Sequence, residues 1–212
     1  MPITDYGNEL LAPRKILRWF VLAAVPSAIF YALSVLILKI SGFEIMEILR
    51  DPAQQSGQSS FLGFISNIGV WLWISAATIC LFHGATSNSV GGKDRKELLL
   101  FMALLSMLLA VDDFFMIHDR YIDQNLCYLA YATIALGLLI RCHSAILRID
   151  GFAFVAAGLL LALSILTDLT QSRLPLRYSH SQLIEEGFKF CGAATWLYFS
   201  CLVARHGQDN RV

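Results

Sequence analysis

Charged residues are scarce in this sequence. Of its 212 residues, only 15% are Asp, Glu, Lys or Arg, whereas 57% are hydrophobic. A soluble globular domain usually carries about 25% charged residues. The shortage of charge therefore argues against an ordinary soluble domain and indicates a chain whose main solvent is lipid.

The sequence also lacks an excess of either charge and any paired cysteine motif. Its 16 basic residues balance its 16 acidic ones, so no basic stripe points to nucleic acid. The cysteines are odd in number and none forms a C-x-x-C pair: Cys80, Cys127, Cys142, Cys191 and Cys201. Because they lie within or beside apolar runs, we interpret them as small packing residues rather than disulfide or zinc-binding residues.

Long apolar runs are what the sequence does have. A membrane-spanning helix needs roughly 20 apolar residues. Six segments meet or approach this length: residues 16–40, 61–82, 98–117, 125–140, 152–169 and 183–204. No internal repeat or low-complexity segment divides the chain. We therefore predict an all-α, polytopic membrane bundle of six transmembrane helices, built as a single integral membrane domain over residues 1–212.

The basic residues near the predicted helix ends are distributed unequally. Ten belong to one set of ends: Arg14, Lys15, Arg18, Lys93, Arg95, Lys96, Arg141, Arg148, Arg205 and Arg211. Five belong to the other set: Lys39, Arg50, Arg120, Arg173 and Arg177. Because cytoplasmic loops are richer in Lys and Arg, this bias places both termini in the cytoplasm. We expect an integral protein of the plasma membrane, which in a bacterium is the inner membrane.

One predicted loop has a pattern of its own. Residues 42–51 read GFEIMEILRD, with Glu44, Glu47 and Asp51 on one helical face and Phe43 and Met46 around the other. This pattern predicts a short amphipathic helix in the membrane interface, stopped by a proline at position 52. A flexible linker would follow over residues 54–60. The helix could serve as a lid over a polar site or as a plain surface helix.

Polar side chains gather at one end of the predicted bundle. Threading the six helices brings the ends of the third and fifth and the starts of the second and sixth to the same side, which the charge bias makes the outer one. The polar residues at these ends are Ser66, Asn67, Asp112, Asp113, His118, Asp119, Asp168, His180, Glu185, Glu186 and Lys189. Ionisable groups in membrane helices are costly and mark functional sites.

Two interpretations of this cluster remain open. A structural one is a network of hydrogen bonds and salt bridges that fixes helix register. Lys189 could serve such a network, because Glu185 and Glu186 lie four and three residues before it on one helix. However, the cluster contains the deep pair Asp112–Asp113 and the further buried carboxylate of Asp168. The negative charge of these carboxylates exceeds the positive charge of the one lysine. A structural network should be closer to neutral, so the excess of negative charge favours a functional site.

The residue types suggest a metal-assisted reaction. Carboxylates with one or two imidazoles suit zinc, iron, manganese or calcium. The predicted metal ligands are Asp112, Asp113, His118, Glu186 and His180. Such an ion would lower the pKa of a bound water, and Glu185, tuned by Lys189, would act as general base. Ser66 and Asn67 would donate hydrogen bonds to the substrate or to a developing oxyanion. Asp168 and Asp119 are further polar residues near this site.

Two short motifs resemble known membrane enzymes. Ile65-Ser66-Asn67, together with Leu109-Ala-Val-Asp112-Asp113, resembles the alkaline ceramidase and progestin/adipoQ-receptor group of membrane hydrolases. That resemblance implies a zinc-dependent lipid amidase in which Asp112 or Asp113 is the acidic residue, although the last helix lacks the family's His-x-x-x-His pair. Glu185-Glu186-Gly-Phe-Lys189 resembles the Glu-Glu-x-x-Lys motif of some intramembrane proteases, without the motifs that follow it there.

The leading prediction from the sequence is a membrane-embedded, metal-dependent hydrolase that acts on a lipid or amphiphile at an outward-facing acidic site. Membrane lipid is then the expected partner. The alternatives are a cation- or proton-coupled transporter or channel that uses the same carboxylates, and a non-catalytic accessory subunit. Residues 98–105 and 192–204 carry few polar groups, which argues against a continuous polar path through the membrane.

Overall fold

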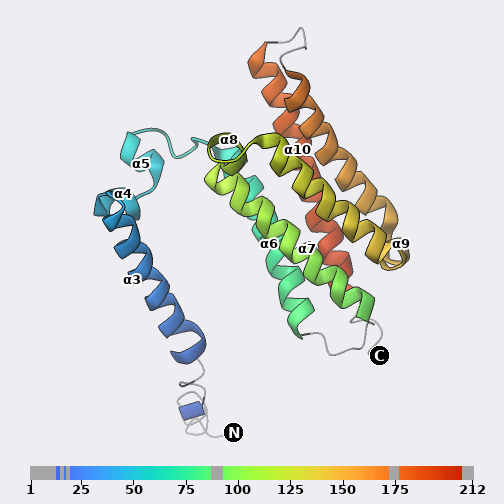
Figure 1. Ribbon diagram of the computed structural model, residues 1–212, viewed down its shortest axis with the longest axis horizontal. Coiled ribbons are helices and arrows are strands. Elements are labelled where there is room, and N and C mark those ends of the chain that lie inside the picture. Colours follow the sequence, from blue (N-terminus) through green and yellow to red (C-terminus); the bar gives the residue numbers. More distant parts are fainter. Residues whose placement is uncertain (1–12, 15–16, 18–19, 87–92, 172–176, 207–212) are drawn as a thin grey trace, which may run out of the picture. The chain divides into compact units, whose positions relative to one another are not determined.

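The described part of the chain is helical. The computed structural model describes residues 13–14, 17, 20–86, 93–171 and 177–206, and this part contains helices, turns and no strand (Figure 1). The predicted all-α class is therefore confirmed. The described chain forms two compact units, residues 1–62 and 63–212. The predicted start of the first helix at residue 16 and both termini lie outside the described residues.

The first unit contains the first apolar helix. A π-helical turn, η1 (Phe20–Ala24), leads directly into α3 (Val25–Ile40). A proline in the first turn of α3 begins the regular helix, where its missing N–H has no intrahelical partner to lose. α3 ends at Ile40, the position predicted from the end of the apolar run.

The segment after α3 forms two short helices. A helix, α4 (Ile45–Leu49), is present inside the predicted segment 42–51, and the backbone N–H of Glu44 donates to Glu47 Oε2 at 2.8 Å in a capping box. Its predicted location in the membrane interface stays a prediction. Pro52, expected to stop this helix, instead begins a second one, α5 (Pro52–Ser56). Asp51 caps α5, because its Oδ1 accepts from the N–H of Ala53 at 2.8 Å. The prediction of a flexible linker from residue 54 was thus wrong for its first residues.

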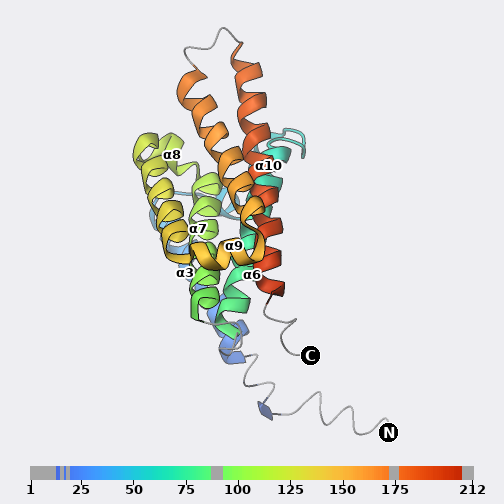
Figure 2. The same ribbon diagram turned by 90° about the vertical axis from the view of Figure 1, so that its right-hand side faces the viewer.

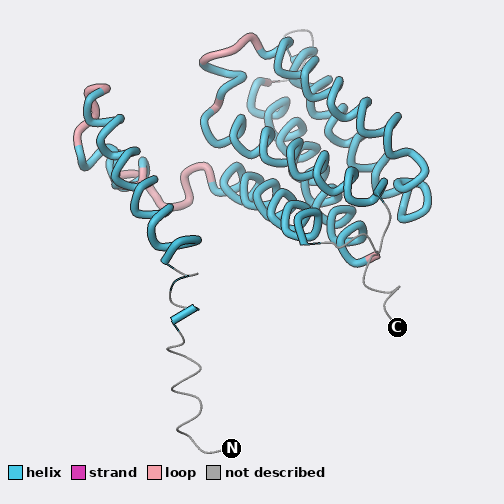
Figure 3. The backbone as a smooth tube through the Cα atoms, turned by 60° about the horizontal axis from the view of Figure 1, so that its bottom comes forward, coloured by secondary structure: helices cyan, strands magenta, loops and turns pink. Residues whose placement is uncertain are grey.

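The second unit is a helical bundle. Its elements are α6 (Phe64–Thr86), α7 (Lys93–Phe115), α8 (Ile117–Arg120), α9 (Gln124–Thr170) and α10 (Tyr178–Arg205). Figure 3 shows these long helices gathered side by side. α10 contains the predicted segment 183–204 and begins five residues before it. α7 begins five residues before the predicted segment 98–117 and ends at Phe115, two residues before its predicted end.

α9 is a helical hairpin. At Asp150 the backbone leaves the helical region (φ −166°, ψ 86°), and the chain folds back (Figure 2). The Tyr128 hydroxyl donates to Asp168 Oδ2 at 2.8 Å, whereas 40 residues of straight helix would separate them by about 60 Å. We call residues 124–149 the first arm and residues 151–170 the second arm. They contain the predicted helices 125–140 and 152–169, and the expected loop between these is also helical.

Five described helices are long and apolar enough to cross a membrane: Phe20–Ile40, Phe64–Thr86, Asp94–Phe115, Gln124–Thr170 and Tyr178–Arg205. Large apolar side chains also remain on the outside, such as Phe152 with 84% and Ile40 with 78% of its surface exposed. Outward-facing apolar surface on long helices is the arrangement that lipid requires. The chain is therefore an integral membrane protein.

The bundle core is densely packed near the start of α7 and the end of α10. Leu98, Leu99 and Met102 of α7 and Phe199 and Val203 of α10 are fully buried. A buried arginine closes this end: Nε of Arg95 donates to the Val203 carbonyl at 2.9 Å and its Nη2 to the Ala204 carbonyl at 2.7 Å. These bonds satisfy carbonyls that the end of a helix leaves unpaired.

Candidate functional site

The site begins where α7 breaks. Met116 adopts a left-handed conformation (φ 52°, ψ 46°), the only positive φ of a non-glycine among the described residues. This turn brings α8 back toward the end of α7. The backbone N–H of His118 then donates to Asp112 Oδ1 at 2.9 Å, and His118 Nδ1 lies 2.8 Å from Asp112 Oδ2. The carboxylate of Asp112 thus holds both backbone and ring of a residue six positions later.

In the Asp112–His118 pair, the carboxylate is placed to orient the imidazole as a base. Asp112 is 4% exposed, so its carboxylate is shielded from water and held by the histidine. A carboxylate on one ring nitrogen fixes the orientation and tautomer of an imidazole and leaves the other nitrogen available to accept a proton. That nitrogen, Nε2, lies 3.5 Å from Oδ1 of the exposed Asp119.

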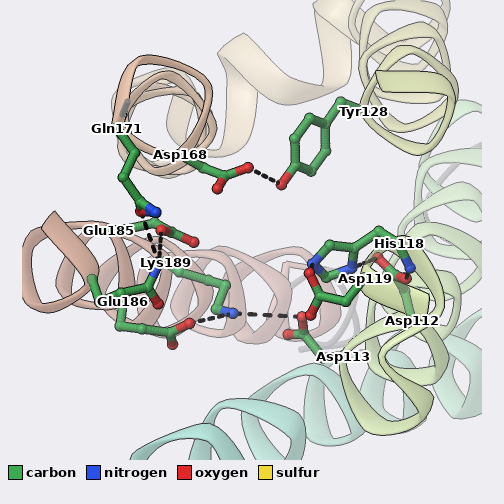
Figure 4. Close-up of polar contacts among 11 residues, drawn as sticks. Asp112, Asp113, His118, Asp119, Tyr128, Asp168, Gln171, Glu185, Glu186 and Lys189 are labelled. Carbon is green, nitrogen blue, oxygen red and sulfur yellow. Dashed lines mark hydrogen bonds and ion pairs between the residues drawn. The ribbon is translucent and has the colours of Figure 1, made fainter. Parts of the chain in front are cut away.

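A second group joins three helices around Lys189. The Nζ of Lys189 lies 2.8 Å from Glu186 Oε1, one turn earlier on α10, and 3.7 Å from Asp113 Oδ1 on α7 (Figure 4). The other oxygen of Asp113 accepts a hydrogen bond from Trp73 Nε1 of α6 at 3.1 Å. Lys189 therefore neutralises Glu186 locally and Asp113 across the bundle, and the acidic residues predicted to converge do so at its ammonium.

Two further carboxylates have neutral partners. Glu185 Oε2 accepts from Gln182 Nε2 at 2.8 Å, and that amide also donates to Gln171 Oε1 at 3.0 Å. Asp168 accepts from the hydroxyl of Tyr128. Figure 4 shows Asp168 and Glu185 close together, on α9 and α10 respectively. In the part of the chain that the structure describes, neither carboxylate forms an ion pair with a lysine or arginine.

These groups surround a cavity of about 310 Å³. That volume is at the lower end of the range of small-molecule sites, about 300–1,000 Å³. Its polar wall consists of Asp112, Asp113, His118, Tyr128, Tyr131, Ser164, Glu185 and Lys189. Its apolar wall includes Leu105, Leu109, Ala132, Ala135, Gly158, Leu161, Ala162 and Ile165. The walls come from α6, α7, α8, α10 and both arms of α9, so the cavity exists only in the assembled bundle.

A smaller cleft lies beside Lys189. It has a volume of about 10 Å³, enough for about one water, and Ser66 lines it together with Trp73, Asp113, Glu186 and Lys189. Ser66 is thus near the lysine but does not line the large cavity. Asn67 lies exposed in the first turn of α6 and lines neither space.

Some of the predicted site residues line the large cavity, and others lie exposed outside it. Asp112, Asp113, His118, Glu185 and Lys189 line the large cavity, and Glu186 reaches it through Lys189. His180, in the first turn of α10, and Asp119 are exposed. Among the described residues, no three His, Cys, Asp or Glu side chains are placed to hold a metal ion together. The predicted metal-ligand set stays a prediction.

Aromatic residues of the cavity were missed by the sequence analysis. Tyr128 and Tyr131 of the first arm and Trp73 of α6 line it. The tyrosines are three residues apart, on one helical face, at the end of the predicted fourth helix that lies nearest the polar cluster. That spacing is the signal that could have found them. For Trp73 the sequence offers no comparable signal.

The fold and the site define an α-helical membrane protein with a cavity that is acidic at one end and apolar at the other. The chain belongs to the family described as Domain of unknown function (DUF8692), whose model matches residues 19–203. The match spans every residue of the cavity. Comparisons with curated proteins and with solved structures give no match.

Proposed function

We propose that this protein is a membrane-embedded hydrolase that acts on a lipid or another amphiphile. One observation carries the proposal: the buried Asp112–His118 pair opens into a cavity with an acidic and an apolar end. An amphiphile has the same division between a polar head and an apolar chain. A bond near the head of such a molecule would lie beside His118.

The cavity residues can support hydrolysis of an ester or amide. His118 Nε2 would take a proton from a water molecule as the oxygen of that water attacks the substrate carbonyl. Asp112 would stabilise the resulting imidazolium, and Lys189 would offset the charge that develops on the carbonyl oxygen. The imidazolium would then give its proton to the leaving alcohol or amine, which releases a carboxylic acid as the second product.

The described residues do not hold a complete set of metal ligands in place. A divalent metal, as predicted from the sequence, would therefore recruit further ligands when it binds. The described residues offer pairs, such as His118 Nε2 and Asp119 Oδ1 at 3.5 Å. A zinc, iron, manganese or calcium ion held by a pair would need water or substrate to complete its coordination. Mass-spectrometric metal analysis of the purified protein tests this version. About one metal per chain, lost in His118→Ala, would support it, and a metal-free active protein would refute it.

The proposed topology has six crossings, because each arm of α9 would span the membrane separately. Both termini would then be cytoplasmic, in accordance with the basic residues at those helix ends. The site would lie in the outer half of a plasma membrane. Single cysteines placed at residue 57 and at residue 90, in a variant without the native cysteines, test the orientation. An impermeant thiol reagent on intact cells should label the first and not the second.

Ion-coupled transport by the same carboxylates is the competing proposal. The excess of carboxylates over the one lysine favours it. Against it, Leu98, Leu99 and Met102 are fully buried in the packed core about 15–21 Å along α7 from Asp112. Proteoliposomes loaded with a pH-sensitive dye test it directly: a proton or cation flux that disappears in Asp113→Asn would favour transport.

The hydrolase is tested with purified protein in nanodiscs. Single-chain and two-chain esters and amides are supplied, and products are identified by mass spectrometry. Because a general base contributes roughly 10²–10⁴-fold to a rate, His118→Ala and Asp112→Asn should each lower turnover by that factor. His143→Ala is the matched control, since His143 is exposed and its ring contacts only a backbone carbonyl of its own helix.

The outcomes separate the alternatives. Product formation that is lost in His118→Ala and retained in His143→Ala supports the proposal. Product formation at equal rates in the wild type and in His118→Ala would refute the assigned mechanism. If no member of the panel is cleaved by a folded wild type, the assignment as a hydrolase of such amphiphiles fails.

A further inference from the structure

The acidic end of the cavity has more carboxylate than its own cations neutralise. Asp113 and Glu186 share the single ammonium of Lys189. His118 can supply at most one charge to Asp112. Glu185 lines the cavity and receives only an amide hydrogen bond among the described residues. Asp168 does not line the cavity, and it receives only a phenolic one. An uncompensated carboxylate is costly away from water, so a bound cation would relieve this end of the cavity.

Aromatic rings surround the same space. Trp73, Tyr128 and Tyr131 line the cavity beside Asp112, Asp113 and Glu185. The face of an aromatic ring attracts a cation, and Trp and Tyr are the strongest side chains in this respect. Rings combined with carboxylates form the kind of site that binds an amine or a quaternary ammonium group. An anionic head beside Glu185 would instead be repelled, because no lysine or arginine pairs with that carboxylate among the described residues.

Part of the apolar end lies between the two arms of α9, and we call this part the slot. Ala132 and Ala135 line it from the first arm, and Gly158 and Ala162 from the second. A Cβ added at Gly158 would meet no atom within 4 Å, so open space lies directly over this backbone. Ala132, Gly158 and Ala162 are exposed, which places an opening of the cavity along this slot. Small residues leave room there for one hydrocarbon chain.

We propose that the ligand of this cavity is a single-chain amphiphile with a cationic amine or ammonium head. The head lies against Glu185 among the aromatic rings, and the chain lies in the slot between the arms of α9. This inference rests on the proposed function, because it names the substrate class of the same cavity. It goes further, since it fixes the charge of the head and the number of chains.

Three probes, each with a ten-carbon chain, test the charge: decyltrimethylammonium as the cation, decanoate as the anion and decanol as the neutral molecule. Each is titrated below its micellar concentration into the protein in zwitterionic nanodiscs, with empty nanodiscs as the baseline for partition into lipid. Binding is followed by calorimetry. We expect decyltrimethylammonium to bind about tenfold more tightly than either other probe, because only its head is attracted both by a carboxylate and by the faces of the aromatic rings.

Glu185→Gln tests the position of the head. This change keeps the shape of the side chain and removes its charge. Affinity for decyltrimethylammonium should fall about tenfold, with decanol binding unchanged. Equal binding of all three probes by the wild type would mean that the carboxylates do not select charge, and would overturn the proposal. So would undiminished affinity for the cation in Glu185→Gln.

Gly158→Leu tests the position of the chain. The added Cβ would meet no atom within 4 Å, and the rest of the side chain would fill the slot, so binding of decyltrimethylammonium should be abolished. Gly137→Leu is the matched control: it makes the same change on the same helix, at an exposed glycine outside the cavity whose added Cβ also meets nothing within 4 Å. Equal binding by the two variants would place the probe elsewhere and overturn the proposal.

The test is independent of hydrolysis. His118→Ala should keep its affinity for decyltrimethylammonium while losing turnover. Selective binding of the cation without turnover of any substrate would sustain this inference and defeat the hydrolase. Turnover of neutral or anionic amphiphiles, with no preference for the cation, would sustain the hydrolase and defeat this inference.

Discussion

Replacing Lys189 with methionine should destabilise the bundle strongly. Methionine keeps much of the length of the side chain and its apolar stem but removes the ammonium. That ammonium lies 2.8 Å from Glu186 Oε1 and 3.7 Å from Asp113 Oδ1. In the variant two carboxylates would face each other without the cation between them, so the variant loses two attractions and gains a repulsion.

The size of the effect follows from how far these groups are buried. Breaking a fully buried ion pair costs about 3–5 kcal/mol, whereas an exposed pair contributes about 0–1 kcal/mol. The Lys189, Glu186 and Asp113 side chains are 29%, 34% and 15% exposed. Because water screens them in part, we expect a loss of about 2–3 kcal/mol. For a chain of this length, that lowers the midpoint of thermal unfolding by about 4–12 °C.

Thermal unfolding in a mild detergent, followed by tryptophan fluorescence, measures the loss. Lys39→Met is the matched control, because Lys39 is exposed on α3 and makes no ion pair among the described contacts. The double variant Lys189→Met/Glu186→Gln should recover part of the stability, since it removes one of the two carboxylates left unpaired. An unfolding midpoint of Lys189→Met equal to that of Lys39→Met would show that the lysine reaches water, and would refute the reasoning.

Three further changes test other contacts of the bundle by the same thermal measurement. Arg95→Met should cost about 2–3 kcal/mol, because it removes two charged hydrogen bonds to the last carbonyls of α10; no loss would show that the arginine is not needed to close that end. Met116→Gly should leave stability unchanged or raise it by up to about 1 kcal/mol, since glycine tolerates the left-handed turn. A clear loss there would mean that the Met116 side chain stabilises the site. Trp196→Phe should cost about 1–2 kcal/mol, because its indole donates to the buried Ser106 hydroxyl at 2.8 Å, and a neutral result would contradict this.

The sequence by itself determined the class of the protein and the place of the polar site. Too little charge and several apolar runs of membrane-spanning length are consequences of composition alone, and they led to the all-α class. The sequence also placed Glu185 and Glu186 within reach of Lys189, because residues three and four apart are neighbours on a helix, and the structure selects Glu186 as the partner. Helix alternation was enough to bring Asp113 and Lys189 to the same end of the bundle.

Only the tertiary structure decided which partner each carboxylate has. The contact between His118 and Asp112 depends on a left-handed turn at Met116, which helix periodicity would not predict. The hydrogen bond from Tyr128 to Asp168 depends on the chain folding back at Asp150. These contacts, and the cavity between six helical segments, depend on packing between elements far apart in the chain. A sequence pattern reports the face and the depth of a side chain, whereas its neighbours on other helices are fixed only when the bundle packs.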